Sequence, residues 1–281
     1  MTGERRSRRR FLQRTLALTA AGVAGCSSLG PGGGVGGTSP IQETSGSGAS
    51  LVVELSEGHS VTKLNLVGPS GSLFRSTSVA TGTTTAEIDL FNYSQGWHYT
   101  PGEHSLVAIS DEEEVASKTI PLEPDLEITN VEPYTGGRPT PSNRANLLVS
   151  VENTGTGPTW VYYVGYENAL DRDANHIPTN DYAKTVPLQN LEKPEAKNDV
   201  ILEPGESSEL RGTDSPFLLT EGYHCNNQKV QLSVLVLSGI GTNVRERLSA
   251  TLAGEEFSAN FASTCSDISI ALLEDSSEKN D

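Results

Sequence analysis

The sequence predicts an all-β protein in which two tandem β-sandwiches follow an export signal and a disordered linker. Short segments in which apolar and polar residues alternate recur along the chain, bounded by Gly, Pro, Asn and Ser. The 28 Gly and 15 Pro, with a single Met, leave no long run rich in Ala, Glu, Leu and Lys, which excludes a helical bundle. The length of 281 residues suits two small domains better than one simple sandwich.

Residues 1–25 have the order of a signal peptide. Six arginines precede a short apolar stretch, Leu16 to Ala24, which is too short to span a bilayer. The segment SRRRFLQ at residues 7–13 resembles the twin-arginine export signal S-R-R-x-F-L-K, except that Gln replaces the last Lys. The resemblance implies export of an already folded protein, and an ordinary Sec signal with many arginines is the alternative. The matching residues are Arg8, Arg9, Phe11 and Leu12.

The segment Val23-Ala24-Gly25-Cys26 at the end of this stretch resembles a lipobox, the processing site of lipoproteins. The resemblance implies that the Cys26 thiol takes a lipid and becomes the mature N-terminus. Because two hydrocarbon chains anchor a protein stably, a diacyl or diether lipid would hold it to the extracytoplasmic face of the cell membrane. A stray cysteine is the alternative.

A linker is expected from residue 26 to residue 50. Sixteen of the 24 residues from 27 to 50 are Gly, Ser or Pro, and only Glu43 is charged. Such a segment buries too little apolar surface to offset its ordering entropy. We therefore expect a disordered tether that lifts the folded part off the membrane.

The mature chain is strongly acidic. Residues 26–281 hold 35 Asp and Glu against 14 Lys and Arg, a net charge of −21. This charge argues against a nucleic acid as partner. Apart from residues 111–114 and a tail at 274–281 that we expect to be disordered, the acids are scattered, which favours adaptation to molar salt over a patch for cations or basic partners. Twin-arginine export of so acidic a lipoprotein resembles halophilic archaeal surface proteins.

The first domain is expected from residue 51 to residue 123. Six alternating segments recur at a spacing of about 8–12 residues, which indicates an immunoglobulin-like sandwich. The pattern Y-x-P-G-x-H-x-L-V-A from Tyr99 resembles the late strand and preceding turn of many such domains. The expected strands are Leu51–Leu55, Val61–Val67, Leu73–Val79, Thr84–Leu90, His104–Ile109 and Val115–Ile120.

The second domain is expected from residue 124 to residue 273. Pro124 marks the boundary, because proline cannot join a central strand. The alternating or apolar segments of this domain are Asp125–Val131, Asn146–Gly155, Trp160–Tyr166, Leu202–Leu210 and Val230–Leu237. They predict a second immunoglobulin-like sandwich.

Two short motifs lie in this second domain. They are V-x-N-x-G at residues 151–155 and L-x-P-G-E at residues 202–206. In this order they resemble the cell-adhesion-related (CARDB-like) domain of bacterial and archaeal surface proteins, over about residues 125–237. The resemblance implies a scaffold for binding or spacing with no common ligand. An insertion near residues 168–200 and extra strands from Arg245 to Leu273 depart from that pattern.

The cysteine count predicts a disulfide. With Cys26 lipidated, Cys225 and Cys265 remain as an even pair in an exported body. Two buried free thiols are the alternative. His224 adjoins Cys225, but successive strand residues face opposite ways, so the two do not suit a catalytic dyad.

Neither the acidic loop nor the histidines predict a metal site or a cofactor. Residues 171–175 have the D-x-D-x-N spacing of a calcium loop, but His176 and Tyr182 occupy the positions of the EF-hand Gly and Glu. We expect a solvated loop, and a looser calcium site that includes Asp181 is the alternative. The five histidines lack ligand spacing, which favours turn and strand roles.

Aromatic residues concentrate in two places. Trp97 and Tyr99 lie beside the turn of the first domain, and regular alternation over 160–166 would put Trp160, Tyr162 and Tyr166 on one face of a strand. Core packing is expected, because the Trp of the third strand of a sandwich usually packs inside. The alternative is that these five residues form a binding face for a sugar or a protein.

Known catalytic motifs are absent from the sequence, including G-x-S-x-G, a P-loop and a dinucleotide fingerprint. We therefore expect a non-enzymatic, lipid-anchored cell-surface protein that acts as a binding, adhesion or structural module of the envelope. Its expected partners are the membrane, through Cys26, and an unknown surface protein or glycan. A carbohydrate-recognition module and an envelope hydrolase with an unrecognised site are the alternatives.

Overall fold

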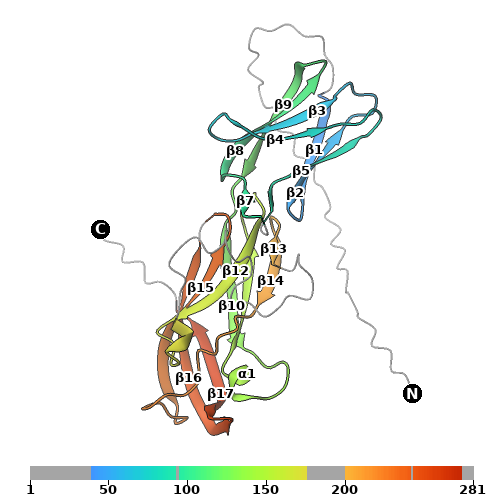
Figure 1. Cartoon of the computed structure of the whole chain (residues 1–281). Coiled ribbons are helices and arrows are strands. Elements are labelled where there is room, and N and C mark those ends of the chain that lie inside the picture. The colour runs from blue at the N-terminus through green and yellow to red at the C-terminus, as the bar shows by residue number, and fades with distance from the viewer. Residues whose placement is uncertain (1–38, 93–94, 176–199, 242, 274–281) are drawn as a thin grey trace, which may run out of the picture. The chain divides into compact units, whose positions relative to one another are not determined.

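The computed structural model describes residues 39–273, apart from 93–94, 176–199 and 242. These residues fold almost entirely into antiparallel sheets, which confirms the predicted all-β class (Figure 1). Their helical elements are one short turn, α1 (Pro141–Arg144), and the 3-10 turn η1 (Asp173–Asn175). Within the described ranges no helix is long and apolar enough to cross a membrane.

The N-terminal half contains two sheets, with strand orders β1-β2-β5 and β4-β3-β8-β9, and a short pair formed by β6 and β7. All six strands predicted here from alternation are present, because their inward positions hold apolar side chains such as Val53, Leu64 and Leu106, which are fully buried. The strands are β1 (Ile41–Ser47), β2 (Ser50–Leu55), β3 (Lys63–Val67), β4 (Leu73–Ser78), β5 (Thr85–Asp89), β6 (Phe91–Asn92), β7 (Trp97–His98), β8 (Gly102–Ser110) and β9 (Glu113–Leu122).

The expected linker extends too far toward the C-terminus, because part of its range forms a strand. Strand β1 lies inside its predicted range and pairs with β2 through a turn at Gly48, whose φ is +57°. Ile41 is buried, and the Gly48 N–H donates to the side chain of Glu203. Composition misled the prediction, because a strand rich in Gly and Ser is held by backbone hydrogen bonds that need no apolar side chain. Residues 26–38 of the linker lie outside the described residues.

The C-terminal half also has two sheets, with strand orders β10-β11-β14 and β13-β12-β15-β16-β17. The five predicted segments and the extra C-terminal strands are all found as strands, although the segment 202–210 is divided by a turn at Gly205. The strands are β10 (Leu126–Pro133), β11 (Leu147–Asn153), β12 (Thr159–Glu167), β13 (Ile201–Leu202), β14 (Ser207–Leu210), β15 (Gln228–Ser238), β16 (Val244–Ala259) and β17 (Ala262–Leu272).

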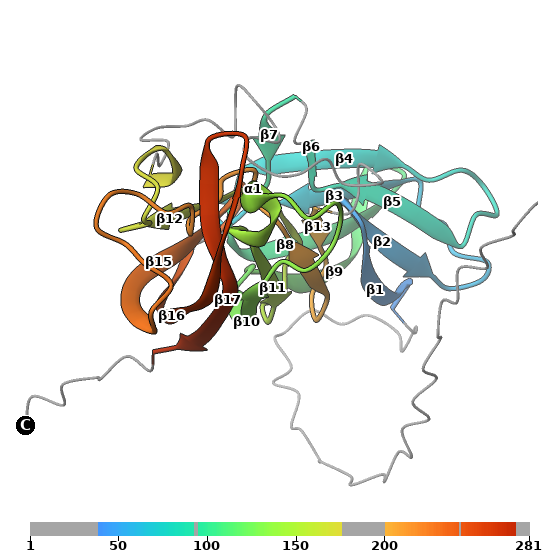
Figure 2. The ribbon, with the colours of Figure 1, turned by 90° about the horizontal axis from the view of Figure 1, so that it is seen from below.

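The last two strands form a long hairpin. Asn260 and Phe261 join β16 to β17, and both have a positive φ, as the tightest hairpin turns require. The hairpin lies against α1 (Figure 2). Most of the expected insertion, from residue 176 to residue 199, and the acidic tail at 274–281 lie outside the described residues.

Candidate functional site

The structure buries four of the five aromatic residues that the binding-face alternative needs. The exposed fraction of the side chain is 0% for Tyr99, 1% for Trp160, 9% for Tyr162 and 0% for Tyr166. A buried ring cannot stack on a ligand, so core packing holds for these four and the binding face is wrong. Trp97 is half-buried and already occupied, because its Nε1–H donates to Gln95 and the guanidinium of Arg75 lies 3.8 Å from its ring centroid.

The expected alternation along β12 is also wrong, for a local reason. A register shift between Val161 and Tyr163, where β12 pairs with β15, inserts one extra residue. A bulge of this kind reverses which face the following side chains occupy, so Trp160 and Tyr166 do not share a face. Every residue from Thr159 to Tyr166 is buried.

Tyr99, Phe91 and Trp160 join the two halves of the described body. The Tyr99 hydroxyl donates a buried hydrogen bond to the carbonyl oxygen of Pro158, at 2.7 Å. The rings of Phe91 and Trp160 stack with their centroids 5.0 Å apart. Gly157 permits this approach, because a Cβ there would collide with the Tyr99 hydroxyl. Burial raises the pKa of the Tyr99 hydroxyl, so it stays a donor.

The side chain of Asn153, from the V-x-N-x-G motif, bonds to four backbone groups. Its Nδ2 donates to the carbonyl oxygens of Gly157 and Leu202, each at 2.9 Å. Its Oδ1 accepts from the N–H groups of Asp125 and Gly155. The residue is fully buried, and the bonds use the whole capacity of a primary amide.

The two motifs that carried the family resemblance meet at this residue. The backbone N–H of Asn153 donates to the carbonyl oxygen of Glu206, and the N–H of Gly205 donates to the carbonyl oxygen of Asn153. Gly155 is required because a Cβ there would collide with the backbone of Glu123 and Asp125. The short motifs therefore form one structural joint, and sequence analysis had given Asn153 no role.

We expect Asn153→Ala to destabilise the protein by about 3 kcal/mol, because four backbone groups, two of them in buried hydrogen bonds, lose their partner. Chemical denaturation would measure the loss. The matched control is Asn130→Ala, at an exposed position of β10, which should change stability by less than about 0.5 kcal/mol. Equal stability of the two variants would show that Asn153 does not hold the joint.

His104 is a buried neutral histidine beside Tyr99. Its exposed fraction is 1%, and its ring contacts those of Tyr99 and Phe74 edge to face. Nδ1–H donates to the Gly102 carbonyl oxygen at 3.0 Å, whereas Nε2 is buried and has no partner. Burial lowers the pKa of the ring and outweighs the bond to Gly102, which raises it.

We expect the protein to lose stability as the pH falls through the range in which free histidine titrates, because unfolding lets His104 take up a proton. The stability that the neutral His104 ring contributes is complete above the pKa of the unfolded chain, about 6.5. It declines as the pH falls below that value toward the pKa of the folded protein. Melting temperatures between pH 7.5 and 5 should fall less steeply in His104→Gln than in the exposed control His224→Gln. Parallel profiles for the two variants would contradict this assignment.

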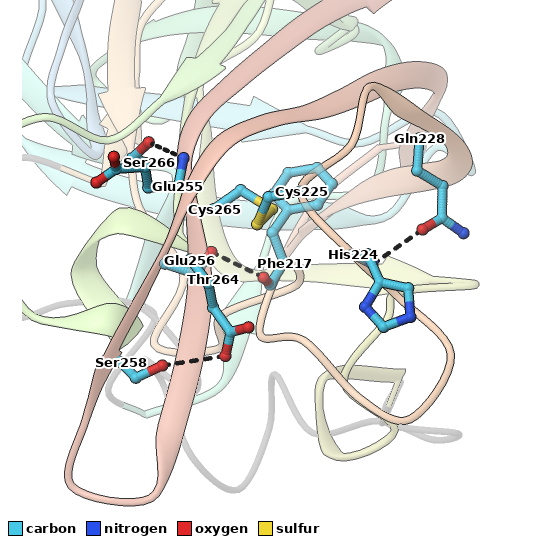
Figure 3. The surroundings of a disulfide bond; sticks show 10 residues. All are labelled: Phe217, His224, Cys225, Gln228, Glu255, Glu256, Ser258, Thr264, Cys265 and Ser266. Atoms are coloured by element: carbon cyan, nitrogen blue, oxygen red, sulfur yellow. Dashed lines mark hydrogen bonds between the residues drawn. A yellow bond between two sulfur atoms is a disulfide. The ribbon is translucent and has the colours of Figure 1, made fainter.

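The predicted disulfide is confirmed. Cys225 and Cys265 are bonded, with their Cα atoms 5.4 Å apart, and the free-thiol alternative is therefore wrong (Figure 3). Two further hydrogen bonds fasten the segment before Cys225 to β17. The Thr264 hydroxyl donates to the carbonyl oxygen of Phe217, and the Leu219 N–H donates to the carbonyl oxygen of Ser263. His224 makes no dyad with this cysteine, because the sulfur is already consumed.

A groove of about 540 Å³ opens beside the disulfide. The end of β10, the loop after it, α1 and the middle of β17 form its walls. Glu132 and Asp267 contribute carboxylates, and Arg144 contributes a guanidinium whose carbon lies 4.7 Å from the ring centroid of Phe257. Charges of both signs suit a polar ligand. The sequence gave no signal for this groove, because its walls are far apart along the chain.

The acidic loop does not form a cation site in the part of the chain that is described. The Asn175 amide holds the loop by bonds to Ala169 and Asp171, and the Asp171 carboxylate accepts from the N–H of Asp173. No three His, Cys, Asp or Glu side chains gather there as metal ligands, nor elsewhere in the described ranges. Asp181 and His176 lie outside those ranges. So do Cys26 and the residues of the expected export signal, Arg8, Arg9, Phe11 and Leu12.

Comparisons with known proteins assign no family. No family model and no curated protein matches the sequence. Similar segments occur in a β-glucuronidase from glycoside hydrolase family 2 (11% identity, 74% of this chain, 19% of that chain, TM-score 0.20), a family 2 member from Bacteroides cellulosilyticus (9%, 71%, 24%, 0.21) and a β-glycosidase from Bacteroides vulgatus (11%, 74%, 23%, 0.19). The chain spans less than a quarter of each, and TM-scores this low carry no argument.

Proposed function

We propose that this is a non-enzymatic protein anchored to the extracytoplasmic face of the cell membrane by a lipid on Cys26, and exported by the twin-arginine route. Its β-sandwich body acts as a binding or structural module of the envelope, related in organisation to CARDB-like domains. The acidic body suits a surface bathed in molar salt, as in halophilic archaea.

The observation that carries this proposal is that a disulfide uses two of the three cysteines and leaves Cys26. The chain has three, and Cys225 and Cys265 are consumed in a disulfide. Disulfides persist in proteins that work outside the reducing cytoplasm. The remaining cysteine is Cys26, at the end of the apolar stretch of the signal peptide and behind Val-Ala-Gly. An exported body with one cysteine left at this position is the arrangement of a lipoprotein.

Two features of the body support a role in binding or structure. The buried contacts of Tyr99, Phe91 and Trp160 hold the N-terminal and C-terminal halves together, as a spacer requires. The groove beside the disulfide, between Glu132, Arg144 and Asp267, offers polar contacts to a ligand. Its walls include β17, which the disulfide holds in place.

We expect Cys26→Ala to release the protein from membranes, because no lipid can then be attached. Membrane fractionation of cells that express the full chain measures this, with Cys265→Ser as the matched control that should remain in the membrane fraction. Retention of Cys26→Ala in the membrane fraction, after a check that its signal peptide has been cleaved, would overturn the anchoring proposal.

A further inference from the structure

We propose that the outer edge of β17 from Asp267 to Leu272 is a self-association surface that pairs antiparallel with the same strand of a second copy. The pairing would join the five-stranded sheets of two copies into one continuous sheet. It goes beyond the proposed function and does not depend on the lipid anchor.

The first observation is that, among the described residues, this edge has no strand paired to it. β17 is the last strand of its sheet and pairs with β16 alone. The Leu273 N–H donates to the carbonyl oxygen of Arg247, so Leu272 and Leu248 form a non-hydrogen-bonded pair. The backbone N–H and C=O of Leu272 therefore point away from β16. By alternation, the N–H and C=O groups of Ile268 and Ile270 also point outward. No described backbone group bonds to them.

The second observation is that most other edge strands of the described body are protected, whereas β17 from Asp267 to Leu272 is not. Bulges interrupt β1 and β10, while β13 and β14 have only two and four residues. β9 carries Glu113, Lys118 and Pro121. Charges, prolines, bulges and shortness are the usual devices that prevent pairing between edges. β17 has 11 residues and a single charge, Asp267.

The third observation is that the edge is complementary to itself. With Ile270 opposite Ile270 of the second copy, Ile268 faces Leu272 of that copy, and Leu272 faces its Ile268. Leu272 is 40% exposed, and both isoleucines are only partly buried, so this register covers apolar surface that is exposed to solvent in the single copy. On the opposite face Ser269 opposes Ala271, and no two carboxylates meet. A twofold axis through Ile270 generates these contacts.

A second copy is favoured over an unrelated strand because, in this register, β17 supplies a compatible partner for each of its own residues. Apolar residues face apolar residues, and Ser269 faces Ala271. The net charge of −21 on each mature chain opposes association at low ionic strength. We therefore expect the pairing at molar salt, where the screening length is about 3 Å.

Cysteine cross-linking in intact cells at native salt tests the proposal. Two variants of the full chain with different epitope tags, Ser269→Cys and Ala271→Cys, are expressed together and oxidised. Both positions are exposed and point away from the core. In the proposed register each faces the other at the distance a disulfide needs, whereas like positions are offset by two residues. The mixed pair should give on the order of tenfold more linked dimer than either variant alone.

The matched control is the pair Ser117→Cys and Thr119→Cys, with the same spacing and exposure on the edge strand β9. Equal cross-linking of the β9 pair, absence of a linked dimer in the mixed β17 pair, or stronger linking in Ser269→Cys alone would each overturn the proposal. Failure of the membrane anchor leaves this readout unchanged, because the cross-link is scored in whichever fraction holds the protein.

Discussion

Removal of the Cys225–Cys265 disulfide is expected to lower the stability of the protein by about 4 kcal/mol, because the bridge closes a loop with a sequence separation of 40. For a folded body of this size that loss corresponds to a fall in melting temperature of about 8–16 °C. Cys265→Ser is the variant of choice, and differential scanning calorimetry is the measurement.

The structural reason for this large effect is the position of the bridge. It ties the segment from Phe217 to Cys225 onto β17, whose edge away from β16 is open from Asp267 to Leu272. Cys225→Ser should match Cys265→Ser, and the double variant should be no worse than either, because all three remove the same cross-link. Unchanged melting of Cys265→Ser, or additive losses in the double variant, would contradict a purely structural bridge.

Dilution from molar salt to 0.1 M is expected to lower the melting temperature on the order of 10 °C, because the screening length grows from about 3 Å to about 10 Å and the carboxylates then repel one another. Circular dichroism over a salt series measures this change. The effect follows from the excess of 35 acids over 14 bases after residue 25.

A variant with fewer charges separates repulsion from other effects of salt. The residues Asp111 to Glu114 at the β8–β9 turn are all exposed, and within the described residues none of them forms an ion pair. Replacing the four carboxylates by amides therefore removes charge with little loss of contacts. This variant should be more stable than the natural chain at 0.1 M salt and equal to it at molar salt. A melting temperature of the natural chain that is constant from molar to 0.1 M salt would defeat the halophilic proposal.

Periodicity predicted most of the strands, because burial on one side of a sheet leaves a period of two in the sequence. It failed at β1, where Gly46 and Ser47 leave no apolar pattern and pairing with β2 decides the structure. It failed again in β12, because one extra residue near Tyr162 reverses the faces. Such features depend on hydrogen-bond partners that are distant in sequence.

The candidate site divides in the same way. The disulfide was predicted from the number of cysteines and from the expected export, both of which rest on the sequence alone. The groove between Glu132, Arg144 and Asp267 and the hydrogen bonds of Asn153 depend on which segments the fold brings together. The open edge of β17 required the order of strands in the sheet, which alternation does not encode.

Mass spectrometry of the N-terminal peptide of the protein taken from cell membranes would show whether a lipid on Cys26 anchors it. We expect a mature chain that begins at Cys26 and carries a diacyl or diether lipid in thioether linkage. An N-terminus at another residue, or an unmodified Cys26 thiol in membrane-derived protein, would contradict it.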